Sequence, residues 1–169
     1  RRVDVDSRGA VLWRAFLDCF DGAACADVGT LFTIPFDPAD PAQTKSLLLD
    51  TGRMNVGFEF HPRYAENGHM FVTTVTQREG QPGLIRVSRF TQPRKNPPTD
   101  ILASEKKIIE WTADGHRGGC LRFGPDGYLY IGVGDGSGIA DEKVTGQDIS
   151  DLYASILRID INKPQADLP

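Results

Sequence analysis

The chain has 169 residues, enough for one ordinary domain with a sizeable core, and its 40% apolar and 25% charged residues are typical of a soluble globular protein. A net charge of −4 gives no reason to expect nucleic acid or an anionic membrane as a partner, and no apolar run approaches the ~20 residues of a membrane span. Eighteen glycines and eleven prolines favour a turn-rich β protein.

The first part of the chain carries no recognisable motif, and we treat 1–28 as an unassigned lead-in segment. Arg1-Arg2 do not begin a twin-arginine signal, because residues 3–8 are not apolar, so we expect a processed or truncated segment. Residues 10–20 have the spacing of an amphipathic helix. A strand is not excluded there, since nearly every position is apolar.

The three cysteines allow two interpretations. Cys19 and Cys25 are close enough in sequence to form a disulfide in an oxidising compartment, which leaves Cys120 as a buried thiol in a strand. Three reduced cysteines are an equally good interpretation, because spacing alone cannot establish a bridge.

Two strands are expected next along the chain. Residues 29–36 form the first, which Pro35 and the following Asp37-Pro38 end, and residues 46–49 form the second. Residues 37–44 between them are a polar turn that contains proline.

An internal repeat then predicts the fold class. Three segments recur in the same order: 58–62 aligns with 121–125, 68–72 with 127–131, and 84–88 with 156–160. Residues 107–111 supply a fourth strand to the first unit. Repeated units of four antiparallel strands predict an all-β protein built from β-propeller blades, about two to two and a half of them here. Because at least ~4 blades are usual in a closed propeller, we expect a piece of a larger one.

Two connections between the repeated strands are also informative. The second unit carries an insertion within 136–152 that is rich in Gly, Asp, Ser and Gln, which we interpret as a functional loop and not as core. Residues 91–99 are expected to form a surface loop, and 164–169 a frayed end or a linker to the next blade.

The stretch 115–136 has the pattern of strand, tight turn, strand. Residues 125–127, Pro-Asp-Gly, form the turn, and the β-branched and aromatic run 128–133 predicts a second strand buried on both faces. If the strands pair about this turn, His116 and Asp135 reach the same edge of the sheet, in glycine-rich loops that a ligand can approach.

His116 and Asp135 are therefore the candidate catalytic residues. A histidine titrates near pH ~6.5 and can accept a proton close to neutrality. A neighbouring carboxylate orients the ring and makes it a better base. The alternative is an exposed turn histidine beside a turn aspartate, a combination that is common in loops.

Other motifs are weaker. Residues 132–138 fail the dinucleotide-binding pattern in the spacing of the third glycine, and no helix pattern follows them. His61 and His69 have no cysteine or acidic residue at ligand spacing and are interpreted as structural.

A calcium site in the 136–152 loop is also not favoured. Asp135, Ser137 and Asp141 could bind calcium through oxygen, but the glycine and the final glutamate of an EF-hand loop are missing. We interpret them as part of a solvated acidic loop, and no metal-ligating residue is assigned.

Three stretches carry a family resemblance. They are GHRGGCLRFGPDGYLYIGVGDG at 115–136, GQDISDLYASILRIDIN at 146–162 and VGFEFHPRYAENGHMFV at 56–72. Over about residues 45–162 the chain resembles the glucose/sorbosone dehydrogenase family, whose members are six-bladed β-propeller quinoproteins that use pyrroloquinoline quinone (PQQ) and calcium. The resemblance implies that 29–169 is a partial propeller domain of this family.

The resemblance also implies an activity, a PQQ-dependent sugar dehydrogenase. In this family the histidine matching His116 is the general base, which takes the proton from the anomeric hydroxyl of the sugar while hydride passes to PQQ, and the aspartate matching Asp135 supports it. His116, Gly136 and Ser137 are the expected cofactor contacts. Expected partners are a sugar substrate and either the remaining blades or an electron acceptor, in a periplasmic or secreted protein.

The chain departs from the family pattern in places. Gly115 stands where an acidic or other polar residue is frequent, and the neighbourhood of Gly52 lacks a Gln or Glu. Residues 153–155, Tyr-Ala-Ser, replace Leu-Gly-Lys, which affects packing more than chemistry. The cationic residues and carbonyls that hold PQQ and calcium come from later blades of the family, so the isolated segment is expected to be inactive.

Two functions of different classes remain open. A sugar dehydrogenase is favoured by the presence of His116 and Asp135, whereas a non-catalytic propeller that binds a partner is favoured by the loss of polar groups at Gly115 and Gly52. A calcium-dependent lactone hydrolase has little support, because metal ligands do not recur between the repeats.

Overall fold

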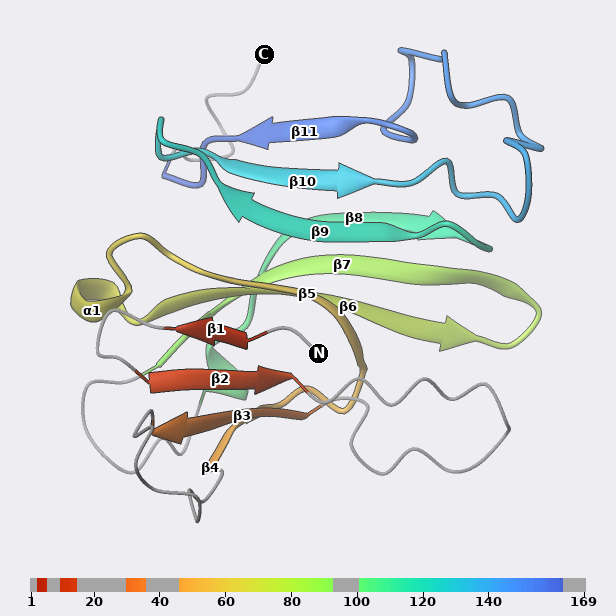
Figure 1. Cartoon of the computed structure of the whole chain (residues 1–169). Helices are drawn as coiled ribbons and strands as arrows, with labels where there is room; N and C mark the ends of the chain where they lie inside the picture. Colours follow the sequence, from red (N-terminus) through yellow and green to blue (C-terminus); the bar gives the residue numbers. More distant parts are fainter. Residues whose placement is uncertain (1–2, 6–9, 15–29, 36–45, 93–100, 163–169) are drawn as a thin grey trace.

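Apolar residues that alternate along short segments, with turn residues between them, fold this chain into three antiparallel sheets that follow one another in sequence (Figure 1). The computed structural model describes residues 3–5, 10–14, 30–35, 46–92 and 101–162. The predicted all-β class is confirmed.

The first sheet has the strand order β1-β2-β3-β4. Its strands are β1 (Val3–Val5), β2 (Ala10–Arg14), β3 (Thr30–Pro35) and β4 (Ser46–Asp50). The two strands predicted over 29–36 and 46–49 are thus confirmed. The lead-in segment 1–28 supplies β1 and β2 to the same sheet. The domain boundary predicted at residue 28 stays a prediction.

The helix predicted over 10–20 is wrong for residues 10–14, where β2 pairs with β3. A run that is apolar at nearly every position suits a strand as well as a helix, and the pairing with a distant strand decides between them. Residues 15–20 lie outside the described part of the chain, as do Cys19 and Cys25, the turn 37–44, most of the loop 91–99 and the segment 164–169.

The second sheet has the order β5-β6-β7-β8. Its strands are β5 (Met54–Phe60), β6 (His69–Arg78), β7 (Gln81–Thr91) and β8 (Lys106–Ala113). The short helix α1 (Tyr64–Asn67) connects β5 to β6, and a 3-10 turn, η1 (Leu102–Ser104), precedes β8. The four strands of the first repeated unit are therefore present in the predicted order.

The third sheet has the order β11-β10-β9. Its strands are β9 (Gly118–Phe123), β10 (Leu129–Val133) and β11 (Ile156–Ile159). The predicted hairpin is confirmed, with Leu129 opposite Phe123 and Val133 opposite Gly118. In its turn, the Asp126 carboxylate accepts hydrogen bonds from the Tyr128 N–H, the Tyr130 hydroxyl and the Arg158 guanidinium.

Two expectations about burial in this hairpin are wrong. In β10, Leu129, Ile131 and Val133 are buried, but the residues between them are only half-buried, so the strand has one core face and not two. Cys120 is an exposed free thiol, because it alternates with the buried Leu121 and shares the outer face of β9 with Arg122.

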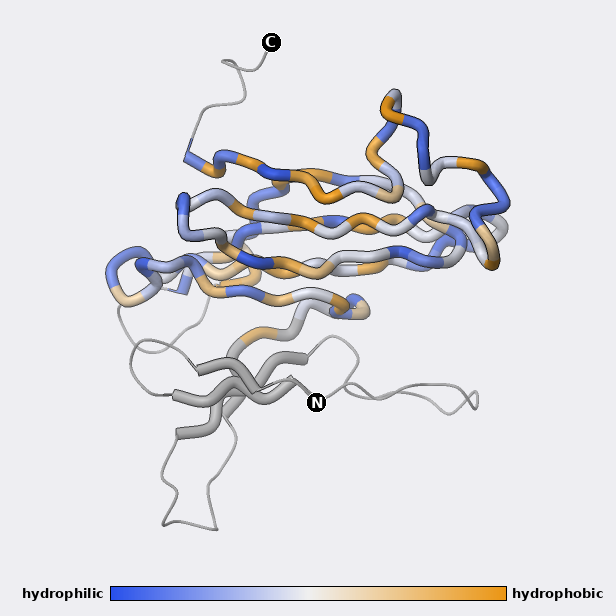
Figure 2. Tube along the Cα trace, turned by 45° about the horizontal axis from the view of Figure 1, so that its top comes forward, coloured by the Kyte–Doolittle hydropathy of each residue, from blue (hydrophilic) through white to orange (hydrophobic). Residues whose placement is uncertain are grey.

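The second sheet lies between the other two and contributes to both hydrophobic cores (Figure 1). Leu49 of β4 packs in one core with Phe58, Met70, Val72 and Phe90 of the second sheet. The other core joins the second and third sheets, and its buried residues are Phe71, Val75, Ile85, Val87, Trp111, Ala113, Leu121, Leu129, Ile131 and Val133. Figure 2 shows hydrophobic and hydrophilic residues alternating along the strands of the second and third sheets.

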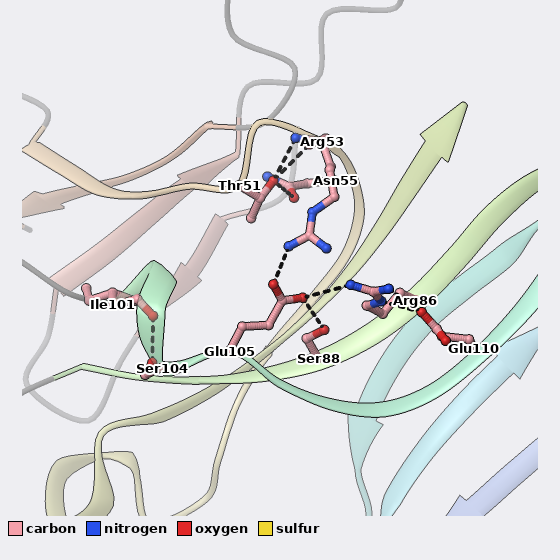
Figure 3. A network of polar contacts seen from close by, with 9 residues as sticks. All are labelled: Thr51, Arg53, Asn55, Arg86, Ser88, Ile101, Ser104, Glu105 and Glu110. Atoms are coloured by element: carbon pink, nitrogen blue, oxygen red, sulfur yellow. Dashed lines mark hydrogen bonds and ion pairs between the residues drawn. The ribbon is translucent and has the colours of Figure 1, made fainter. Parts of the chain in front are cut away.

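A polar network lies on the second sheet beside the connection from the first (Figure 3). Arg53, between β4 and β5, donates to Glu105 at 2.7 Å, and Glu105 also accepts from the Ser88 hydroxyl at 2.7 Å. Arg86 bridges Glu105 and Glu110. Burial alone would raise the pKa of Glu105, but these hydrogen bonds and the positive charges of Arg53 and Arg86 outweigh it, so its pKa lies below the usual value.

Within the described residues, no helix is long and apolar enough to cross a membrane.

Candidate functional site

His116 and Asp135 come from two loops that leave the third sheet at the same edge. His116 lies between β8 and β9, and Asp135 lies two positions after the end of β10. Because Val133 pairs with Gly118, the two loops continue side by side, with Asp114 N–H donating to Gly136 O at 3.1 Å and Gly136 N–H donating to His116 O at 3.4 Å. The register of one hairpin therefore positions both side chains.

The two side chains are hydrogen-bonded to each other. His116 Nδ1 lies 3.0 Å from Asp135 Oδ1 and 3.3 Å from Oδ2. The Asp135 side chain is 17% exposed, whereas that of His116 is 56% exposed. The carboxylate is thus the inner, supporting group and the imidazole is the one that solvent or a ligand can reach.

The surroundings of Asp135 favour its ionised form. The Ser137 backbone N–H donates to Oδ1 at 3.0 Å, and this hydrogen bond together with the one from His116 outweighs burial, so the pKa of Asp135 lies below its usual value. A carboxylate only accepts hydrogen bonds, so Nδ1 of the neutral His116 ring carries the proton. Nε2 is left with its lone pair and can accept a proton.

The other predicted cofactor contacts lie beside the pair but are buried. Gly136 packs under the ring of Tyr153, where a Cβ would lie 2.7 Å from Cε1. Ser137 is nearly inaccessible in the described structure and holds Asp135 through its backbone. The structure therefore brings all four predicted site residues together, and His116 is the exposed one among them.

The glycine at position 115 has a steric reason. A Cβ there would overlap the carbonyl oxygen of Ser137 and would lie 2.9 Å from its carbonyl carbon. The loops at the site approach so closely that no side chain fits at Gly115 with this backbone. The close packing of the two loops therefore requires glycine at position 115, where the family frequently has a polar residue.

Four residues that contact this site were not found from the sequence: Asp114, Lys143, Thr145 and Tyr153. Lys143 forms an ion pair with Asp114 at 2.7 Å, and the Thr145 hydroxyl donates to Asp135 O at 2.8 Å. The Tyr153 hydroxyl donates to Thr112 O at 2.6 Å. The two partners in each of these contacts lie 10 to 41 positions apart in the sequence, so no local pattern could have indicated them.

His61 has a structural role, and the His69 ring packs edge-on against it with the ring centroids 5.9 Å apart. His61 Nδ1 accepts the Arg63 N–H at 3.0 Å and contacts the Asn67 amide at 2.9 Å, which fixes the turn before α1. Burial and the positive charges of His69, Arg63 and Arg89 outweigh the effect of Glu66 and lower the pKa of His61. Among the residues with described coordinates, no group of three or more His, Cys, Asp or Glu side chains is arranged to hold a metal ion.

Two groups of known proteins that resemble this chain are informative. The Hedgehog-interacting protein of Homo sapiens is 36% identical over 118 residues, which are 65% of this chain and 17% of that protein. The Hedgehog-interacting protein of Mus musculus is 36% identical over 149 residues, 83% of this chain and 21% of that protein. The chain thus spans about a fifth of these curated relatives.

The second group consists of solved dehydrogenase structures. The PQQ-bound aldose sugar dehydrogenase from Streptomyces coelicolor superposes with a TM-score of 0.61 at 20% identity, over 93% of this chain and 43% of that one. At this identity the likeness shows the fold, so the three sheets are blades of a β-propeller. The family model described as Glucose / Sorbosone dehydrogenase matches residues 50–167. This chain therefore belongs to the glucose/sorbosone dehydrogenase family.

Proposed function

We propose that the protein containing this chain oxidises a sugar hydroxyl and that His116 is the general base. The observation that carries the proposal is the hydrogen bond of 3.0 Å between His116 Nδ1 and the inner carboxylate of Asp135, with the imidazole exposed beside it. General-base histidines need this arrangement, in which a third group orients the ring and the free nitrogen faces the substrate.

The residues of this chain account for the proton in such a reaction. Nε2 of His116 would accept the hydroxyl proton, and the hydride from the same carbon would pass to the quinone that the proposal assigns to the whole protein. The imidazolium that forms is stabilised by the ionised Asp135, whose charge the Ser137 N–H holds in place. The orientation of the imidazole ring does not change, because Nδ1–H donates to the Asp135 carboxylate before and after the proton transfer.

The described residues do not by themselves fit PQQ. The quinone carries several anionic groups, which call for several cationic partners. Near His116 the Lys143 ammonium is already bound to Asp114, and Arg117 offers one buried Nε–H without a partner in the described structure. PQQ and calcium therefore remain part of the proposal for the whole protein, with His116 as the exposed contact and the cationic partners of the quinone supplied by other parts of that protein. The expected periplasmic or secreted location also stays a prediction.

Steady-state kinetics on the full-length protein, supplied with PQQ and calcium, test the base. We expect His116→Gln to lower kcat by ~10²- to 10⁴-fold with an unchanged melting temperature, because glutamine cannot accept the proton. Asp135→Asn should lower kcat less, since it removes the charge but keeps much of the shape. His69→Gln is the matched control and should leave kcat unchanged. Unchanged turnover in His116→Gln would exclude His116 as the base.

A second function, a non-catalytic propeller that binds a partner, has its own support. The relatives at 36% identity are named for an interaction, whereas the solved dehydrogenase is 20% identical. The apolar side chains of Ile139, Val144 and Ile149 are also exposed in the loop beside His116. Absence of sugar oxidation by the full-length protein, loaded with PQQ and calcium and tested against several aldoses, would favour this function.

A further inference from the structure

We propose that the turn formed by residues 140–146 is a clamp that positions the His116–Asp135 pair, with Thr145 and Lys143 as its two contacts. The effect of this clamp on catalysis rests on the proposed function. The structural part, the positioning of the pair, stands on the contacts alone. Lys143 and Thr145 contact the neighbours of the His116 ring, through Asp114 and the backbone of Asp135, so they are positioning residues.

Thr145 forms the first contact of the clamp. Its hydroxyl lies 2.8 Å from the backbone oxygen of Asp135 and 3.2 Å from Asp141 Oδ1, and both of these atoms are acceptors. The side chain is buried in the described structure. A single hydroxyl proton thus joins the turn to the residue that carries the supporting carboxylate.

Asp141 holds Thr145 in this position. Its carboxylate also accepts the Thr145 N–H at 2.8 Å and the Gly146 N–H at 2.9 Å. Ala140, Asp141 and Val144 have φ angles of 56°, 49° and 55°, in the left-handed region that non-glycine residues rarely adopt. A turn that keeps three such residues must be held by specific contacts, and Asp141 supplies them.

Lys143 forms the second contact, on the other loop of the site. Its ammonium donates to Asp114 Oδ2 at 2.7 Å and to Gly136 O at 3.3 Å. Asp114 lies two positions before His116, and Gly136 lies directly after Asp135. Lys143 therefore connects the loop that carries the base with the loop that carries its partner.

Apolar burial does not explain the order of this turn. Ile139, directly before the turn, and Val144 within it are both exposed, so the turn is held by polar contacts with the neighbours of the pair. If the turn were only a solvated connection, no group in it would need to reach Asp135 or Asp114. The contacts converge on both loops of the site.

The test uses the full-length protein and pairs each disruptive change with a conservative one. Thr145→Val keeps the shape and removes the donor, whereas Thr145→Ser restores it. Lys143→Met removes the charge, whereas Lys143→Arg keeps it. Thr74→Val is the matched control, because the hydroxyl of Thr74 is buried and has no partner in the described structure. The readouts are kcat, KM, the pH profile of kcat and the ¹⁵N spectrum of histidine-labelled protein, with the His116 signal identified by its loss in His116→Gln.

We expect Thr145→Val to lower kcat roughly 3- to 10-fold with little change in KM, as expected for loss of one buried orienting contact. Lys143→Met should lower kcat less, because the Lys143 and Asp114 side chains are 43% and 54% exposed and an exposed ion pair contributes less. The His116 signal should lose its preference for the Nδ1–H tautomer, and Thr145→Ser and Lys143→Arg should restore both properties. A His116 signal in Thr145→Val identical to that in Thr74→Val would overturn the clamp. A changed signal with no turnover in any variant, wild type included, would retain the clamp and reject the proposed function.

Discussion

Gly57 and Gly119 allow β5 and β9, the first strands of the second and third sheets, to approach more closely than side chains permit. A Cβ at Gly57 would overlap the carbonyl oxygen of Gly119 and lie 2.6 Å from Thr73 Oγ1, and the Thr73 hydroxyl itself donates to Gly119 O at 2.8 Å. The second and third sheets, which also share a hydrophobic core, are thus in backbone contact at this small, buried point.

Replacement of Gly57 by alanine should separate these sheets. We expect Gly57→Ala to reduce the free energy of unfolding by about 1–3 kcal/mol, because an added methyl group in a packed interior forces the backbone apart. The matched control is Gly132→Ala in β10, where a Cβ would meet its nearest neighbour at 3.8 Å and should change stability by less than ~0.5 kcal/mol. Urea denaturation of the three proteins measures the difference. Equal stability of Gly57→Ala and wild type would contradict the close approach.

At the scale of single elements, Glu105 connects β8 to the segment that links the first two sheets (Figure 3). Its side chain is 22% exposed and faces both Arg53 and Arg86. Loss of the carboxylate charge would leave two guanidinium groups close together without their shared partner. The ion pair between Lys107 and Glu110 differs, because the Lys107 side chain is 58% exposed and an exposed pair contributes little.

We expect Glu105→Gln to lower the free energy of unfolding by about 1–3 kcal/mol at neutral pH, and Lys107→Met by less than ~1 kcal/mol. The effect of Glu105 should depend on pH. Its pKa is lower in the folded than in the unfolded state, so its stabilisation is full above the unfolded value, near ~4.3, and is lost as the pH falls through the folded value. Denaturation of wild type and variant from pH 7 to pH 3 should therefore show the two curves converging. A constant difference across this range would exclude the charge of Glu105 as the cause.

The sequence predicts elements well where the signal is local. The Pro-Asp-Gly turn at 125–127 and the alternation on either side of it indicated the hairpin and, through its register, the meeting of His116 with Asp135. The same alternation could have predicted that Cys120 is exposed, because Cys120 lies on the same face of β9 as Arg122. The apolar character of cysteine led to the opposite expectation.

Elements that depend on distant partners were not predictable in this way. β2 is a strand because Ala10 to Arg14 pair with residues about twenty positions later, and its own composition suits a helix equally. The 140–146 turn contains left-handed residues such as Ala140 and Val144 that no residue-type rule would assign. Its conformation follows from contacts of Thr145 and Lys143 with residues in other loops.

For the molecule as a whole, the third sheet ends in an edge strand. In the part of the chain that the structure describes, β11 pairs only with β10, so its other edge presents unpaired backbone groups. Ile156 at the start of this strand is 78% exposed. An apolar edge strand of this kind is a template for pairing with another chain.

The 169-residue chain expressed alone should therefore associate through β11 as its concentration rises. Ile156→Lys should shift the chain toward the monomer, because a lysine on an edge strand opposes pairing with a second copy. Ile149→Lys is the matched control: Ile149 is also exposed, but it lies in the loop before β11, where no strand edge is available. Size-exclusion chromatography with light scattering measures the molar mass of each variant over a concentration series. A monomeric wild-type chain, or an equal effect of the two lysines, would show that the edge of β11 does not drive association.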